Sequence, residues 1–229
     1  MRIWSIIPAL CLAACSAEAP LPQEQKAEAA LDEKLPVMGP ERTILAFGDS
    51  LFAGYNLAEE EGYPEKLEAA LRARGVNASV IDAGVSGDTS AAGLQRIGFV
   101  LDNLKTQPDL ALVELGGNDL LRGLSPEQTR ENLTGIMDAL AGRGIPVLVM
   151  GMQAPPNMGA DYRAQFNAIY PALAERYEAA LIPFWVESLV GRNELIQQDR
   201  IHPTAEGIEL LVADTIDAVT DALPEEEAG

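Results

Sequence analysis

The chain contains one histidine, His202, and an aspartate, Asp199, stands three residues before it. At this spacing the carboxylate can reach ring Nδ1, which leaves Nε2 free to accept a proton from a serine hydroxyl. Ser50, in residues 48–51 (GDSL), follows an apolar run and is a candidate for that partner, although this segment taken alone is more typical of a helix cap. Together the three side chains predict nucleophilic attack on a carbonyl carbon, with the imidazole as general base. The alternative is that Ser50 caps a helix and that Asp199 is a surface residue beside an incidental histidine.

Two other glycine-containing segments could place N–H groups against a ligand. Gly87, in residues 84–90 (GVSGDTS), lets the backbone approach a ligand closely, and Asn118, in residues 116–119 (GGND), offers a side-chain amide. Taken alone, each segment is more typical of an ordinary turn. Ser86 is a competing nucleophile, but Asp88 stands where the Gly-x-Ser-x-Gly elbow of the α/β-hydrolases needs a glycine.

Apolar strands and amphipathic helices alternate along residues 41–223, which we read as one domain. We expect strands at residues 43–47, 78–83, 110–115 and 145–152, a short apolar piece at 180–184, and helices at residues 63–74, 89–105, 126–142, 162–179 and 205–223. Continuous apolar strands between helices indicate a parallel sheet covered on both faces, which is an α/β fold. Ligands bind at the carboxyl ends of the strands in such folds, and Ser50, Gly87 and Asn118 all follow predicted strands.

Four short segments, in this order along the chain, resemble the sequence blocks of the SGNH hydrolases, also called the GDSL esterase and lipase family. They are residues 48–51, Gly87, residues 116–119 and residues 199–202. Residues 86–90, 116–124 and 151–157 are similar more particularly to the bacterial arylesterases and to the acyl-CoA thioesterase I/lysophospholipase group. The resemblance covers essentially all of residues 41–223. It implies a three-layer α/β/α sandwich with a flavodoxin-like parallel sheet of about five strands.

The resemblance also implies a role for each of these residues. Ser50 is the nucleophile, His202 the general base, and Asp199 the carboxylate that orients the imidazole. The backbone N–H groups of Ser50 and Gly87 and the side-chain amide of Asn118 form an oxyanion hole. No cofactor is implied. We also expect no metal, because with one histidine and no available thiols only carboxylates could bind one.

The substrate is less sharply defined than the reaction. Candidate substrate-binding residues are Asp49, Asp119, Pro155 and Met158, although the last two could simply pack a loop. We expect a serine esterase that hydrolyses aryl or short-chain acyl esters, with thioesters and lysophospholipids as further candidates. The alternatives are a carbohydrate O-acetyl esterase or a non-catalytic lipoprotein that binds envelope components. Arg200 stands where similar proteins often have glycine, and this departure bears on substrate preference.

The net charge of the chain bears on which partners it can bind. We expect small-molecule or lipid esters as its substrates. Lys and Arg number 16 and Asp and Glu number 35, which gives a net charge of −19. Nucleic acid is therefore not expected as a partner, because its phosphates would be repelled. For the same reason a polyanionic substrate such as acyl-CoA is disfavoured.

The N-terminal residues are expected to be a targeting segment. Arg2 precedes an apolar run at residues 3–14 that is too short to span a bilayer, so residues 1–14 read as a signal peptide. Residues 12–15 (LAAC) resemble the bacterial lipobox, which implies cleavage before Cys15 and attachment of lipid to its sulfur. The alternative is a plain secretory signal.

Further expectations concern the two ends of the chain. A lipidated Cys15 would anchor the protein to a membrane on the periplasmic side of the envelope, and Ser16 favours the outer over the inner membrane. Residues 15–40 then form a flexible tether, because prolines interrupt a stretch of alanine and acidic residues. Residues 224–229 form an acidic tail.

Overall fold

Five parallel strands form a single sheet in the order β2-β1-β3-β4-β5. The structure is a computed structural model and describes residues 36–225. The strands are β1 Arg42–Gly48, β2 Ala78–Gly84, β3 Leu110–Glu114, β4 Val147–Met150 and β5 Ala180–Ile182. The predicted α/β fold with a parallel sheet of about five strands is therefore confirmed.

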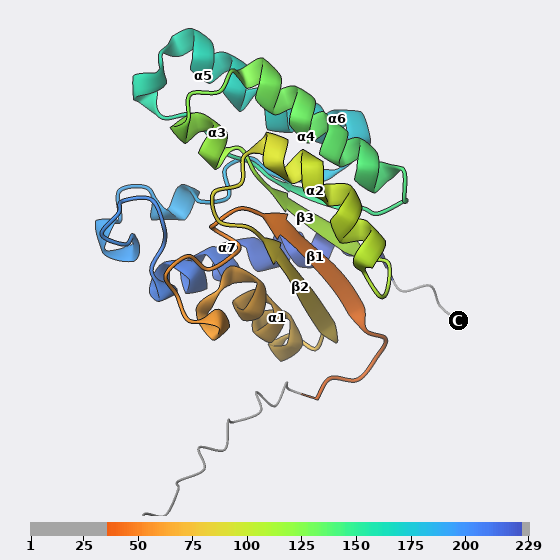
Figure 1. The fold of residues 1–229 in the computed structure, drawn as a ribbon. Helices are drawn as coiled ribbons and strands as arrows, with labels where there is room; N and C mark the ends of the chain where they lie inside the picture. Colours follow the sequence, from red (N-terminus) through yellow and green to blue (C-terminus); the bar gives the residue numbers. More distant parts are fainter. Residues whose placement is uncertain (1–35, 226–229) are drawn as a thin grey trace, which may run out of the picture. The chain divides into compact units, whose positions relative to one another are not determined.

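Helices cover both faces of the sheet, so the domain has three layers (Figure 1). Two of them, α1 (Tyr63–Ala73) and α7 (Ala205–Ala222), lie on one face. The other face carries α2 (Ser90–Asn103), α4 (Pro126–Ala141), α5 (Ala160–Asn167) and α6 (Ile169–Tyr177). The short helix α3 (Gly117–Leu121) follows β3 directly, and four single 3₁₀ turns lie at Glu59–Glu61, Pro156–Met158, Glu187–Leu189 and Asn193–Leu195.

Strand β1, which lies between β2 and β3, shows why a strand covered on both faces reads as an unbroken apolar run. Successive side chains of a strand point to opposite faces of the sheet. Ile44 and Ala46 join the apolar cluster under α1 and α7, whereas Leu45 and Phe47 join the cluster under α2, α4 and α6. All four side chains are completely buried, because each face of the sheet has its own helical layer.

The predicted helix at residues 162–179 is wrong, since the structure has two helices there, α5 and α6, that meet at Ala168. Pro171 explains the break, because a proline has no N–H to donate to the carbonyl four residues earlier and its ring clashes with that carbonyl. The predicted start of the helix at residue 126 is confirmed. The Ser125 hydroxyl accepts a hydrogen bond from the Gln128 N–H, at 3.3 Å, in a capping box.

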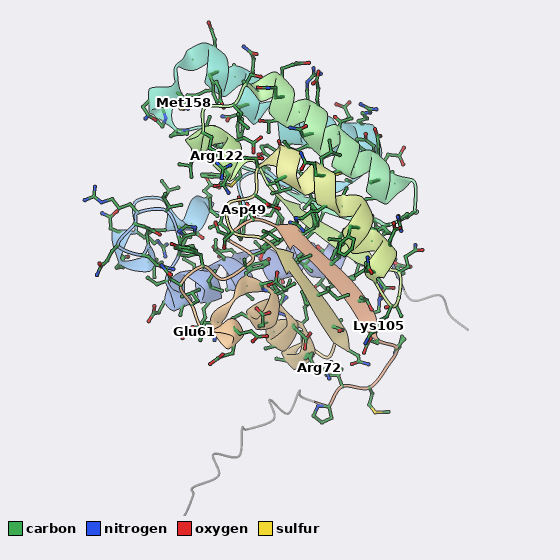
Figure 2. The ribbon with its side chains drawn as sticks, in the orientation of Figure 1. Asp49, Glu61, Arg72, Lys105, Arg122 and Met158 are labelled. Atoms are coloured by element: carbon green, nitrogen blue, oxygen red, sulfur yellow. The ribbon has the colours of Figure 1, made fainter. Side chains whose placement is uncertain are left out.

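The carboxyl ends of the strands gather at one end of the domain, where Figure 2 labels Asp49 next to the end of β1. Lys105 and Arg72 lie at the opposite end of the strands. No helix within residues 36–225 is both long enough and apolar enough to cross a membrane. The predicted signal peptide, Cys15, most of the tether and residues 226–229 lie outside the described residues.

Candidate active site

Ser50 lies just beyond β1, where the chain turns away from the sheet. The turn depends on Gly48, since a Cβ there would lie 2.7 Å from the Phe52 ring and 2.8 Å from the carbonyl oxygen of Glu114. Such distances are shorter than van der Waals contact, so only glycine lets β1 end this close to β3. The hydroxyl of Ser50 is thereby held at the carboxyl end of the sheet, which is where the sequence placed it.

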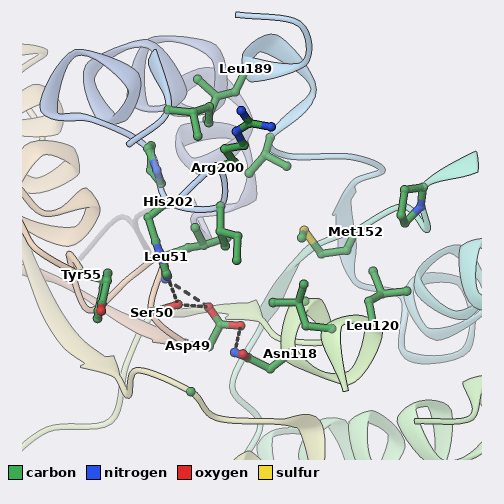
Figure 3. A pocket seen from close by; sticks show the side chains of 18 of the residues that line it. Asp49, Ser50, Leu51, Tyr55, Asn118, Leu120, Met152, Leu189, Arg200 and His202 are labelled. Atoms are coloured by element: carbon green, nitrogen blue, oxygen red, sulfur yellow. Dashed lines mark hydrogen bonds between the residues drawn. The ribbon is translucent and has the colours of Figure 1, made fainter. Parts of the chain in front are cut away.

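Ser50, His202 and Asp199 form one continuous chain of hydrogen bonds. Ser50 Oγ lies 2.8 Å from His202 Nε2 (Figure 3), and His202 Nδ1 lies 2.7 Å from Asp199 Oδ2. With Asp199 ionised, Nδ1 carries the proton and Nε2 accepts from the serine hydroxyl, a tautomer that follows from the hydrogen-bond network. Serine, base and orienting carboxylate are therefore aligned as nucleophilic catalysis requires.

The second oxygen of Asp199 is also occupied, which fixes the loop that carries the histidine. Asp199 Oδ1 accepts hydrogen bonds from the backbone N–H groups of Ile201, at 2.9 Å, and His202, at 3.1 Å. Burial by itself would raise the pKa of Asp199, but the hydrogen bonds from the His202 side chain and from these two N–H groups lower it to about 2. The carboxylate is thus ionised at any pH at which an imidazole could act as a base.

Tyr55 and Gln197 support the histidine, and sequence analysis missed both. The rings of Tyr55 and His202 lie 4.3 Å apart between centroids, at an angle of 32°. Gln197 Nε2 donates to the carbonyl oxygens of Tyr55 and Pro203, each at 2.8 Å, and the Gln197 N–H donates to the carbonyl of His202 at 2.7 Å. These bonds connect the loop after β1 with the loop before α7. Nothing in the local sequence signals this contact, because it joins segments that are far apart in the chain.

The residues predicted for an oxyanion hole lie together around Ser50. Gly87 and Asn118 line the same cavity as Ser50. Gly87 has φ +85°, and its carbonyl accepts a hydrogen bond from Arg122 Nη2 at 2.7 Å; Figure 2 labels this arginine. Asn118 Nδ2 donates to Asp49 Oδ2 at 2.9 Å and to the carbonyl of Asp88 at 3.0 Å. Both amide protons of Asn118 already have acceptors, so an oxyanion would have to share one of these protons with Asp49 or Asp88.

Asp49 lines the floor of the cavity with a carboxylate that already has protein partners. It is only 2% exposed, and its Oδ1 accepts from the Leu51 N–H at 3.1 Å while its Oδ2 accepts from Asn118. Burial raises the pKa of Asp49, and the hydrogen bonds from Leu51 and Asn118 act in the opposite direction. The geometry therefore fits a residue that positions Asn118 and the Ser50 turn better than one that binds substrate.

Glu114, the last residue of β3, is a buried acid that sequence analysis missed. Its side chain is completely buried, and its Oε2 accepts a hydrogen bond from the Asp49 N–H at 3.2 Å. Its Oε1 has no hydrogen-bond partner within residues 36–225. Burial, followed by the nearby charge of Asp49, raises the pKa of Glu114 well above its usual value. A lone acidic residue in an apolar strand was the available signal, because such a residue is rarely buried without a role.

Asp119, which sequence analysis predicted to bind substrate, lies in the protein interior instead of at the cavity. Its side chain is completely buried and does not line the cavity. Asp119 Oδ2 accepts from the Ser90 N–H at 2.8 Å, and Oδ1 accepts from the hydroxyls of Ser90 and Thr129, the latter at 3.0 Å. The residue therefore ties α3 to the starts of α2 and α4. Its neighbour Asn118 faces the cavity because successive residues of a helix point in different directions.

The cavity at Ser50 has a volume of about 840 Å³ and a mostly apolar lining. Pro155 and Met158 line it, as predicted. Its other apolar lining residues are Leu51, Leu120, Leu121, Met152, Val186, Leu189, Val190, Ile196, Ile201 and Pro203. Ser86 lines it too, but the hydrogen bond of His202 goes to Ser50. No group of three or more acidic, histidine or cysteine residues within residues 36–225 is placed to hold a metal ion.

Known proteins are similar to this chain in both sequence and fold. Residues 46–210 match the GDSL-like Lipase/Acylhydrolase family. Esterase TesA of Pseudomonas aeruginosa is 40% identical over 162 residues, which are 71% of this chain and 80% of the relative. Thioesterase 1/protease 1/lysophospholipase L1 of Escherichia coli is 39% identical over 161 residues, which are 70% of this chain and 75% of the relative.

A solved structure agrees with these sequence matches. The crystal structure of AlinE4, described as an esterase of the SGNH-hydrolase family, has a TM-score of 0.70 and 62% identity, and the match covers 82% of this chain and 100% of AlinE4. The family match spans more than half of the chain and includes Ser50, Asn118 and His202. The chain therefore belongs to the GDSL-like lipase/acylhydrolase family.

Proposed function

We propose that the protein is a serine esterase in which Ser50 forms a covalent acyl-enzyme. The observation that carries this proposal is the unbroken series of hydrogen bonds from Ser50 through His202 to Asp199, at the floor of an apolar cavity. Membership of an acylhydrolase family and the naming of relatives as esterases support it.

The reaction follows from the position of each group. His202 Nε2 takes the proton of Ser50 while Oγ attacks the carbonyl carbon of the ester. The resulting oxyanion accepts hydrogen bonds from the backbone N–H groups of Ser50 and Gly87 and from the amide of Asn118. Collapse of this intermediate expels the alcohol, which takes the proton from His202. Water, deprotonated by the same imidazole, then releases the acid from Ser50.

We infer that the acyl or aryl part of the substrate occupies the apolar cavity. Met152, Pro155 and Met158 lie on the loop after β4 and form one wall of it. A lining of this kind favours acyl and aryl esters, because burial of their apolar surface supplies binding free energy. The relative from E. coli is named for thioesterase and lysophospholipase activities, so thioesters and lysophospholipids are also candidate substrates here.

Hydrolysis of 4-nitrophenyl esters, from acetate to palmitate, tests the proposed function. We expect turnover by residues 16–229, and a loss of at least about 10³-fold in kcat for Ser50→Ala. Ser86→Ala is the matched control, since Ser86 lines the same cavity and should retain most of the activity. Absence of turnover on every ester, or equal losses in both variants, would contradict the proposal.

We propose further that lipid on Cys15 holds the enzyme at the periplasmic face of the envelope, more specifically at the outer membrane. The support is the sequence of residues 12–15 together with the proline-rich segment that follows it. The mass of the mature N-terminal peptide tests this. We expect a diacylglyceryl-modified Cys15 and a soluble product from Cys15→Ala. An unmodified N-terminus at another residue would instead indicate a plain secretory signal.

A further inference from the structure

Arg200 has a backbone conformation that disfavours any residue with a side chain. Its φ is +62°, and only Asn56 and Glu178 among the other non-glycine residues of 36–225 also have positive φ. In the left-handed region Cβ lies too close to the following carbonyl oxygen, so glycine is the residue that fits best. An arginine here, between Asp199 and His202, introduces local strain. Strain of this kind at a functional site suggests that the side chain has a use.

The side chain of Arg200 lines the cavity that holds Ser50. Figure 3 shows it near Leu189, and the next residue, Ile201, also lines the cavity. It is the only lysine or arginine among the lining residues. Leu121, Val190 and Ile201, which also line the cavity, are largely exposed apolar side chains, with 63%, 67% and 46% of their surface accessible. The lining is therefore mostly apolar and includes one arginine, Arg200, and one carboxylate, the buried Asp49.

The guanidinium of Arg200 has no hydrogen bond or ion pair within residues 36–225. Many other arginines of these residues do have such partners: Arg96 pairs with Asp88, Arg143 with Asp102, and Arg122 donates to the carbonyl of Gly87. Arg200 is an exposed residue of the lining, so its guanidinium is accessible to a ligand that enters the cavity. Guanidinium groups bind carboxylates and phosphates through paired hydrogen bonds.

We propose that Arg200 is a specificity-determining residue that binds an anionic group of the substrate at the mouth of the cavity. The substrate class is then an amphiphilic ester, whose apolar chain enters the cavity while its carboxylate or phosphate lies against the guanidinium. The proposal rests on the esterase function proposed above and adds a substrate class to it. One charge of this kind is compatible with the acidic protein, because the local attraction acts at short range whereas the net charge is screened by salt.

Two matched pairs of esters test the proposal on the full-length protein. The carboxylate pair is the 4-nitrophenyl monoester of glutarate against 4-nitrophenyl valerate. The phosphate pair is lauroyl glycerol phosphate, a single-chain lipid with a phosphate headgroup, against lauroyl glycerol, which lacks the phosphate. In each pair the measured quantity is the ratio of kcat/KM for the anionic ester to that for the neutral ester. We compare the wild type with Arg200→Gln, Arg200→Lys and Arg143→Ala, the last removing one positive charge elsewhere on the surface.

We expect Arg200→Gln to lower the ratio about tenfold in at least one pair, and Arg200→Lys to retain most of it. A decrease in the carboxylate pair alone identifies monoesters of dicarboxylic acids, and a decrease in the phosphate pair alone identifies lipids with a phosphate headgroup. The ratio should also decrease when salt is raised from about 0.05 M to about 0.5 M. An unchanged ratio in both pairs, or an equal decrease in Arg143→Ala, overturns the proposal.

A binding measurement separates this proposal from the esterase function. Calorimetric titration of Ser50→Ala with dodecyl phosphate needs no turnover. We expect the double variant Ser50→Ala/Arg200→Gln to bind this probe about tenfold more weakly. If the wild type hydrolyses no ester but this difference is found, the esterase function fails and the anion site remains. Equal affinities for the two variants overturn the anion site, whatever the activity.

Discussion

The side-chain amide of Asn118 donates a hydrogen bond to the carboxylate of Asp49, with 2.9 Å between Nδ2 and Oδ2. The same Nδ2 donates to the carbonyl of Asp88, so two acceptors fix which end of the amide is the donor. A flipped amide would place its oxygen against two other oxygens. Asp49 thus fixes the orientation of the Asn118 amide, with its N–H groups rather than its carbonyl directed toward Asp49 and Asp88.

Asn118→Ala should lower kcat by about 10²-fold to 10³-fold, because one donor to the oxyanion is lost. The loss should fall mainly on kcat, since the oxyanion exists only in the intermediate and the flanking transition states. Steady-state kinetics of the wild type and the variant on the same 4-nitrophenyl ester measure kcat and KM. A rise in KM alone, with kcat unchanged, would show that Asn118 binds the ground state instead.

Asp49→Asn should lower kcat by about tenfold, because a neutral amide no longer fixes the orientation of Asn118. If Asp49 acts through Asn118, the double variant with Asn118→Ala should be no slower than Asn118→Ala alone. Additive losses in the double variant would instead assign Asp49 an independent role. Thermal unfolding of each variant separates these kinetic effects from a loss of folded protein.

Glu114→Gln should change how stability depends on pH. The pKa of Glu114 is raised by burial, so the folded state holds a proton that the unfolded state releases above its ordinary pKa of 4.5. The free energy of unfolding of the wild type should therefore fall as pH rises from about 5 toward neutral, by at most about 1.4 kcal/mol per pH unit from this group. Urea titrations should show a flatter profile for Glu114→Gln, and parallel profiles would mean that Glu114 is ionised in the folded protein.

Asp199 contributes stability with the opposite pH dependence. Its folded pKa of about 2 lies below the ordinary 3.8, so its contribution is present above about pH 4 and is lost as pH falls toward 2. Asp199→Ala should weaken the dependence of unfolding on pH in that range and should lower kcat by about 10²-fold or more. Asp217→Ala, which removes an exposed acid paired with Arg74, is the control and should leave kcat near the wild-type value.

Asp119→Ala should destabilise the domain by about 2–4 kcal/mol, because the buried hydroxyls of Ser90 and Thr129 lose their acceptor. Chemical denaturation measures this, with Asp102→Ala as the control. Asp102 forms an exposed ion pair with Arg143, so its loss should cost under about 1 kcal/mol. Equal and small effects in the two variants would contradict the structural role of Asp119.

Local sequence patterns were sufficient for most of the helices and strands and for part of the site. The apolar run at residues 43–47 determined β1 because both faces of that strand are buried. Ser125 and Pro126 determined where α4 begins, because capping depends on neighbouring residues only. The three-residue spacing of Asp199 and His202 predicted their contact, since the two residues belong to one loop.

Other features depended on contacts between distant parts of the chain, and only the tertiary structure decided them. Ser50 and His202 are 152 residues apart, and the distance between Oγ and Nε2 is set by how the loops after β1 and before α7 pack together. The same packing places Tyr55 on the imidazole. Glu114 meets Asp49 because β1 and β3 are neighbours in the sheet, an order that hydrophobic periodicity cannot reveal.

The adjacent residues Asn118 and Asp119 mark the limit of sequence reasoning most clearly. Both are small polar residues in one motif, and both were assigned to the site. The geometry of α3 turns Asn118 to the cavity and Asp119 to the core, where Ser90 and Thr129 bind it. The sequence by itself determined which chemical groups are available and at which strand ends they fall. The direction in which each group points was decided by tertiary packing, because a side chain's direction depends on the elements around it.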